Sequence, residues 1–276
     1  RDASVAMGER VLISHMASRI RDREAMIMQA VFDYHPQFRV QTITADEEDL
    51  SDRRFSFEGG DLLIASSEIT LAGLGTRTTS RGIDFIMNAC AERRQKHHLL
   101  IQELPSAPES FIHLDMVFTI LDHDSCMVYE PLILKSNKYQ TIQIDLENGK
   151  VTSIRNVENL LKALRDLGMD LKPSYCGGKK DPVIQEREQW HSGANFFAVA
   201  PGKLIGYNRN VHTLENLNQS GYEIIKSKEL LEERVDLDRI DKYVITIDGA
   251  ELSRGGGGVR CMTMPYRRSG NDPGNS

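Results

Sequence analysis

The chain has 276 residues, of which 40% are hydrophobic and 27% charged, a composition typical of a globular protein. Its length fits one large domain or two small ones, and without a linker-like stretch we expect a single domain over residues 1–276. The formal net charge of −6 argues against a nucleic-acid or membrane-surface partner, and the longest apolar runs, such as residues 196–200, are much too short to span a bilayer.

The cysteine pattern indicates reduced thiols. Cys90, Cys126, Cys176 and Cys261 form no CxxC pair, and no signal peptide is visible. We therefore expect a cytoplasmic protein. The chain opens with Arg1 rather than Met, which is typical of a fragment or of a chain with unresolved ends.

Three parts of the chain repeat the order strand, strand, helix, strand. The first copy has its elements at residues 5–7, 11–13, 21–34 and 38–40. The second has them at 61–64, 69–72, 78–95 and 99–101, where apolar residues recur at spacings of three and four in the helix. The third has them at 197–200, 204–207, 210–219 and 222–225, with turns at Pro201-Gly202 and Gly221.

A looser copy lies between the second and third. We expect its hairpin strands at 116–120 and 126–129 and its helix at 156–167, and we expect residues 174–190 to form a loop with a short segment. Doubly wound folds alternate single strands and helices, so a hairpin in each unit points to another architecture.

The repeat predicts an α/β propeller of ββαβ blades around an axis. The expected blades are 1–50, 55–105, 113–175 and 190–227, with closing strands and a cysteine loop at 240–265 and a flexible tail at 266–276. Polar residues at the start of each blade would then converge on the centre.

Cys261 is the first candidate for chemistry. It follows the glycine run Gly255–Gly258, which allows the backbone to approach a ligand closely. The flanking Arg254 and Arg260 would favour the thiolate, the nucleophilic form of cysteine. The alternative is an incidental thiol in a mobile loop.

Two further strings carry acid and base groups. In His113-Leu114-Asp115, a strand would place the imidazole and the carboxylate on the same face, as an acid/base group with a neighbouring anion. In Glu58-Gly59-Gly60-Asp61, two glycines between carboxylates suggest a close approach at the inner end of a blade. An ordinary surface turn is the alternative for both strings.

Asp2, Glu58, His113 and Cys261 all fall near the edges of blades. Acids can hold a planar cation by paired hydrogen bonds, and a cysteine can attack its central carbon, so this set predicts a guanidinium substrate. The competing hypothesis is a zinc or iron site. Its ligands would be His113, Asp115, His123 and Asp124, although the chain has no HExxH or HxH motif. Nucleotide binding by the glycine run is not expected, because the run lacks the ending of a P-loop.

Five strings in the chain resemble motifs of the arginine deiminase family of guanidino-group-modifying enzymes. In chain order they are Arg1-Asp2, Glu58-Gly59-Gly60-Asp61, the run from His113-Leu114-Asp115 to Thr119, Gly206-Tyr207-Asn208-Arg209-Asn210, and the run from Ser253 to Pro265 that contains Cys261. The resemblance implies a pentein-like five-bladed propeller around a pseudo-fivefold axis. The family's first blade and helical insertion, which precede the Arg-Asp motif, have no counterpart in this chain.

The resemblance also implies roles for individual residues. Cys261 corresponds to the nucleophile and His113 to the general acid/base, with Asp2 and Asp115 gripping the guanidinium and Glu58 as a further acid beside it. Arg21 and Arg77 correspond to arginines that hold the α-carboxylate of the substrate. Many deiminases carry an arginine where this chain has Gly256, so the substrate preference stays open.

The implied reaction converts L-arginine to L-citrulline and ammonia through a covalent thiouronium intermediate, with no cofactor and no metal. The implied partner is a small molecule, and a homo-oligomer is compatible with the sequence. The alternatives are an amidinotransferase, a hydrolase of agmatine or methylated arginine, and an arginine-binding protein without turnover.

Overall fold

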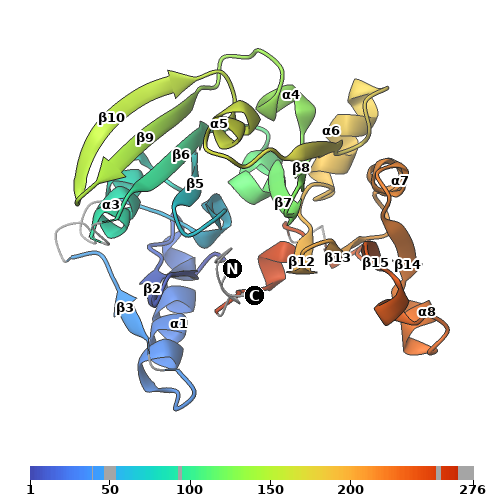
Figure 1. Cartoon of the computed structure of the whole chain (residues 1–276). Helices are drawn as coiled ribbons and strands as arrows, with labels where there is room; N and C mark the ends of the chain where they lie inside the picture. Colours follow the sequence, from blue (N-terminus) through green and yellow to red (C-terminus); the bar gives the residue numbers. More distant parts are fainter. Residues whose placement is uncertain (39, 47–53, 93–94, 253–255, 267–276) are drawn as a thin grey trace.

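The computed structural model of the chain describes residues 1–38, 40–46, 54–92, 95–252 and 256–266. Figure 1 shows its sheets distributed around a central region in which the N-terminal residues and the last described segment lie side by side. Main-chain and side-chain hydrogen bonds of Arg1 to Arg260, Cys261 and Thr263 hold these two segments together. The predicted tail falls almost wholly on residues 267–276, outside the described part.

The first sheet is a small ββαβ unit. Strands β1 (Ser4–Met7) and β2 (Arg10–Ile13) form the expected hairpin, α1 (Asp22–Tyr34) follows, and β3 (Gln41–Ile43) returns parallel to β2. The predicted return strand at 38–40 is therefore wrong by about three residues.

The second sheet has five strands in the order β10-β9-β6-β5-β4. Its own unit consists of β4 (Leu62–Ile64), β5 (Ile69–Leu74), α3 (Ser80–Ala91) and β6 (His97–Glu103), with β6 parallel to β5. Thr79 caps α3 by accepting a hydrogen bond from the Gly82 nitrogen, and Ile83, Ile86 and Cys90 bury its apolar face.

The other two strands of this sheet, β9 (Thr141–Glu147) and β10 (Lys150–Val157), form a hairpin that the sequence analysis missed. It lies within the looser repeat, yet β9 pairs with β6 of the second sheet. Its turn, Asn148-Gly149, has positive φ angles of 52° and 79°, and Asn-Gly is a strong hairpin signal in a sequence. The helix predicted at 156–167 is shorter because β10 occupies its start: α5 spans Leu160–Asp166.

The third sheet has the order β11-β8-β7. The hairpin of β7 (Phe118–Asp122) and β8 (Ser125–Val128) is followed by the short helix α4 (Glu130–Ile133), by α5, and by β11 (Lys172–Tyr175) parallel to β8. The loop expected from residue 174 is shorter because β11 extends to Tyr175, and the short segment expected after the loop is the helix α6 (Pro182–Trp190).

The fourth sheet departs from the predicted repeat. Its strands are β12 (Phe197–Ala200), β13 (Lys203–Tyr207), β14 (Glu223–Lys226) and β15 (Tyr243–Ile247), and its helices are α7 (Val211–Gln219) and α8 (Ser227–Leu231). We expected residues 222–225 to return beside β13, but β15 lies between β13 and β14 and is parallel to both. Sequence periodicity identifies which residues form strands, whereas tertiary packing decides which strands pair with each other in a sheet.

Buried apolar residues fill the space within and between these units, and one cluster joins β5, β6, β7, β8 and α5. No helix among the described residues is long and apolar enough to cross a bilayer.

Glu188, which is 1% exposed, ties α6 to α7 just before the loop that leads to β12. Its carboxylate accepts hydrogen bonds from the nitrogens of His212 and Thr213 and from Thr213 Oγ1, at 3.0, 2.8 and 2.7 Å. We expect Glu188→Ala to lower the free energy of unfolding by about 2 kcal/mol, because it leaves buried donors unpaired. Urea denaturation measures this, with the exposed Glu186→Ala on the same helix as the control; equal stability of the two variants would contradict it.

Candidate active site

His113 and Asp115 lie on a short turn that precedes β7. The turn is a 3-10 helix, Leu114–Met116, with His113 at its N-cap, so the prediction that these residues open a strand is wrong. Buried Asp61 fixes the turn: its Oδ1 accepts a hydrogen bond from the Leu114 nitrogen at 2.9 Å, and its Oδ2 accepts one from Thr78 at 2.6 Å. Burial raises the pKa of Asp61 to about 7, although His113 and these hydrogen bonds oppose the rise.

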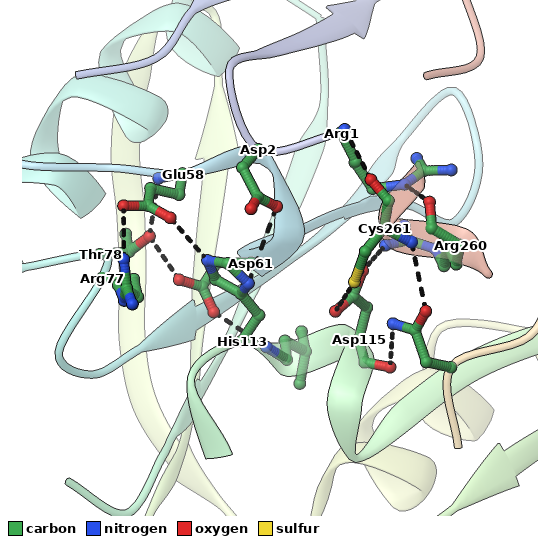
Figure 2. Close-up of polar contacts among 12 residues, drawn as sticks. Arg1, Asp2, Glu58, Asp61, Arg77, Thr78, His113, Asp115, Arg260 and Cys261 are labelled. Atoms are coloured by element: carbon green, nitrogen blue, oxygen red, sulfur yellow. Dashed lines mark hydrogen bonds and ion pairs between the residues drawn. The ribbon is translucent and has the colours of Figure 1, made fainter. Parts of the chain in front are cut away.

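The imidazole of His113 lies among acids. Its Nε2 is 2.9 Å from Glu58 Oε2 and its Nδ1 is 3.8 Å from Asp2 Oδ1 (Figure 2). Gly60 makes room for it, because a Cβ there would lie 2.5 Å from Nδ1. Burial would lower the pKa of His113, but the Glu58 hydrogen bond and the charges of Asp61, Asp2 and Asp115 outweigh burial and raise it to about 9.

Two arginines already pair with the acids next to His113. Arg21 contacts Asp2 Oδ2 at 2.9 Å and Glu58 Oε2 at 3.2 Å, while Arg77 contacts Glu58 Oε1 at 3.4 Å. Burial alone would raise the pKa values of Asp2 and Glu58, yet His113 and Arg21 lower that of Asp2, and His113 and Arg77 lower that of Glu58. Both carboxylates are thus held in the charged form.

Cys261 lies on a second 3-10 turn, Arg260–Met262. Its sulfur is 3.9 and 4.0 Å from the two carboxylate oxygens of Asp115. Gly257, with φ of 89°, packs against it so closely that a Cβ would lie 3.2 Å from the sulfur. A glycine is required there both for the backbone conformation and for space.

Arg260 lowers the pKa of Cys261, as expected of a flanking arginine, but other effects outweigh it. Burial, followed by the charges of Asp115 and Asp2, raises the pKa of Cys261 to about 12, and the opposing effect of Arg260 is smaller. Ser253, Arg254 and Gly255 lie outside the described residues. The thiol is therefore protonated at neutral pH in this structure.

Arg260 is a residue of the site whose position the sequence analysis did not foresee. It is 8% exposed, and its Nη1 donates a short hydrogen bond to Asp115 Oδ2. The carboxylate next to the thiol therefore binds a guanidinium that belongs to the protein itself. Figure 2 shows Asp2 between His113 on one side and Cys261 with Asp115 on the other.

A pocket of about 530 Å³ borders this cluster. Its walls include Gly257, which packs on Cys261, Ile112, which directly precedes His113, and Met116, which ends the turn that carries Asp115. Arg77 and the half-exposed Trp190 also line it.

A metal site was the competing hypothesis. Among the described residues, the group with metal-ligand geometry is Asp2, Glu58 and His113, whose donor atoms lie within 4.8 Å of one another. It does not include His123 or Asp124, and Asp124 instead pairs with lysines at the surface. Arg21 already supplies positive charge to both carboxylates of the group, so they are paired within the chain itself.

The chain matches the arginine deiminase family over residues 1–268. It is 32% identical over 272 residues to the arginine deiminase of Latilactobacillus sakei, a match that covers 97% of this chain and 60% of that protein. The chain belongs to the arginine deiminase family. It spans about 60% of the length of such curated relatives.

Solved structures with the same fold are less similar to this chain in sequence. One is the N-terminal domain of ArgZ, an arginine dihydrolase from cyanobacteria, which has been solved with product and with a covalently bound reaction intermediate. It is 17% identical to this chain, and the match has a TM-score of 0.60 and covers 96% of this chain and 74% of ArgZ's domain. SxtG, an amidinotransferase of saxitoxin biosynthesis from Microseira wollei, is 15% identical, with a TM-score of 0.61 over 98% of this chain and 70% of that one. These likenesses show the α/β pentein fold.

For this family member, the structure brings together Asp2, Glu58, His113, Asp115 and Cys261, which the sequence analysis selected. It places Arg21 and Arg77 on the acids rather than free in the pocket. The structure adds three residues that the sequence analysis did not select as site residues: Asp61, Asn195 and Arg260. Asp61 and Arg260 lie within the quoted motifs, whereas no motif pointed to Asn195.

The raised pKa of His113 links folding to pH. Its folded pKa of about 9 lies above its ordinary 6.5, so its stabilising contribution is complete below about pH 6.5 and is lost as pH rises through 9. Between about pH 7.5 and 8.5 we expect the free energy of unfolding of the wild type to fall by about 1 kcal/mol more than that of His113→Gln. Urea denaturation at each pH measures it, and parallel pH profiles would contradict the assignment.

Proposed function

We propose that the protein hydrolyses the guanidinium group of L-arginine to give L-citrulline and ammonia, with Cys261 as the nucleophile. One observation carries the proposal: the thiol lies 3.9 Å from a carboxylate that already binds a guanidinium, that of Arg260. A site whose acids hold arginine side chains next to a sulfur atom suits attack on a guanidinium carbon.

Substrate binding begins in this proposal with an exchange of guanidinium groups. The substrate takes the place of Arg260 on Asp115 and pairs with Asp2, and its charge lies beside Cys261. The positive charge offsets the two carboxylates that raise the pKa of the thiol, so the thiol gives its proton to solvent water and the thiolate forms in the complex. The thiolate then attacks the central carbon and a C–S bond forms.

His113 then serves as acid and as base. With a pKa of about 9 it is protonated at neutral pH, so it gives its proton to the departing amino group and ammonia leaves. The neutral imidazole takes a proton from water, whose oxygen attacks the thiouronium carbon. The C–S bond breaks, citrulline is released, and Glu58 keeps the imidazole oriented through its 2.9 Å contact with Nε2.

We assign the α-carboxylate of the substrate first to Arg77, which lines the pocket. Arg21 contacts Asp2, Glu58 and Glu24, so its role at the substrate carboxylate requires those contacts to change.

We also propose that the chain is a single catalytic domain and that it belongs to a five-bladed ring. Four sheets in the described residues support that ring, and relatives of greater length have room for a further blade.

The second candidate is an amidinotransferase, which the likeness to SxtG favours. Both reactions pass through a covalent adduct and differ in whether water or an amine removes it. Citrulline formed from arginine without an added amine supports hydrolysis, whereas ornithine formed only when an amine such as glycine is present supports transfer. Agmatine and methylated arginine are the substrates to compare.

Mass spectrometry of protein quenched during turnover tests the nucleophile. We expect the Cys261 peptide to gain the mass of a thiouronium adduct, and we expect Cys261→Ser to lose both adduct and turnover while it still binds arginine. Cys126→Ser, at a buried thiol whose sulfur contacts the carbonyl oxygen of Lys172, is the matched control. Full activity in Cys261→Ser would contradict the covalent mechanism, and arginine binding without ammonia release by the wild type would indicate a binding protein.

The exchange of guanidinium groups makes a separate prediction. We expect Arg260→Met to lower the KM for arginine several-fold, because the substrate no longer competes with an internal group for Asp115, and to destabilise the substrate-free protein, because Asp115 loses its partner. Steady-state kinetics and thermal unfolding with and without arginine measure both effects. Arg165→Met, at an exposed arginine paired with Asp170, is the control, and a raised KM in Arg260→Met would assign Arg260 to binding instead.

A further inference from the structure

The candidate site is assembled from two short turns that lie far apart in the sequence. One carries His113 and Asp115, and the other carries Cys261. Neither turn has the rigidity of a long helix or strand, so contacts between the two must set the distance from the thiol to the carboxylate. The ion pair of Arg260 with Asp115 is one such contact, but the proposed substrate has to break it.

Asn195 joins the same two turns through their main chains. Its Nδ2 donates to the carbonyl oxygen of Asp115 at 3.1 Å, and its Oδ1 accepts from the nitrogen of Cys261 at 3.2 Å. Both ends of one rigid amide are used, one on each turn. Since neither bond involves the carboxylate or the sulfur, both can persist while substrate binds and reacts.

The surroundings of Asn195 hold its side chain in place. It is 2% exposed, and Gly258 lies against it so closely that a Cβ at that position would be 2.6 Å from Oδ1. On its other side, Thr119 of β7 donates to the carbonyl of Ala194 at 2.5 Å, which ties the loop before β12 to the third sheet. The amide is therefore packed between the glycine run and the sheet behind Asp115.

We propose that Asn195 is a positioning residue that sets the separation of Cys261 from Asp115. This inference rests on the proposed function, in which the sulfur must meet a carbon held by Asp115. A displacement of about 1 Å in such a geometry can lower the rate about 100-fold. Asn195 acts through main-chain groups and touches no reacting atom.

Three substitutions separate chemistry from packing. Asn195→Ala removes both hydrogen bonds. Gly258→Ala keeps the amide but pushes it by steric contact. Asn195→Asp keeps the oxygen that accepts from the Cys261 nitrogen but places a second oxygen against the carbonyl of Asp115. It also adds a negative charge, which raises the pKa of the Cys261 thiol further.

We expect Asn195→Ala and Gly258→Ala to lower kcat by about 10- to 100-fold with KM changed less than about threefold. We also expect the rate of Cys261 alkylation by iodoacetamide, without substrate, to change several-fold in both, and its pH profile to move to higher pH in Asn195→Asp. Asn210→Ala is the matched control, because Asn210 is as buried and its Nδ2 donates to the carbonyl of His191, in neither turn. Its kcat, KM and alkylation rate should equal those of the wild type.

Folded Asn195→Ala with the kcat, KM and alkylation rate of the wild type would overturn the inference, and so would reduced stability with unchanged activity per folded molecule. If Asn195→Ala does not fold, Gly258→Ala decides by the same readouts. If the wild type releases no ammonia from arginine, the proposed function is wrong. The inference about Asn195 is then still tested, because the alkylation rates report whether Asn195 sets the environment of Cys261.

Discussion

The structure depends on a concentration of buried acids that must be matched by positive charge. Glu58, Asp61 and Asp115 are completely buried, and Asp2 lies beside them. An unpaired charge in such surroundings is costly, so each acid in the charged form needs a cation or hydrogen-bond donors within reach. Arg21, Arg260 and a protonated His113 fill this need within the chain itself.

The same acids act in opposite ways on the two groups that carry the chemistry. They stabilise the imidazolium of His113 and so raise its pKa, and they oppose the thiolate of Cys261 and so raise its pKa as well. At neutral pH the site therefore holds a protonated imidazole and a protonated thiol.

Glycines and short turns make this crowding feasible. Gly60 lets the imidazole lie against the main chain, Gly257 lets the thiol do the same, and Gly258 lies against Asn195. Hydrogen bonds of Arg1 to Cys261 and Thr263 close the cluster from the chain's first residue. Since the turns are short, their arrangement depends on these cross-links more than on the sheets beneath them.

Much of the local structure followed from the sequence. Hairpin signals and helical spacing predicted the units of the first and second sheets, and the motifs selected Asp2, Glu58, His113, Asp115 and Cys261 before any coordinates. The Asn148-Gly149 hairpin was readable by the same rules and was missed. The place of β15 between β13 and β14 was not readable, because strand neighbours depend on packing between distant segments.

The sequence by itself determined which residue types the site contains and the order of strands and helices that brings them inward, because these follow from local periodicity and from side-chain chemistry. Only the tertiary structure decided that Arg260 pairs with Asp115, that Arg21 and Arg77 bind acids, and that the thiol is protonated. Charge pairing and pKa depend on burial and on distances between segments more than 100 residues apart, as between Asp115 and Arg260. No local pattern encodes those quantities, since they exist only once the chain has folded.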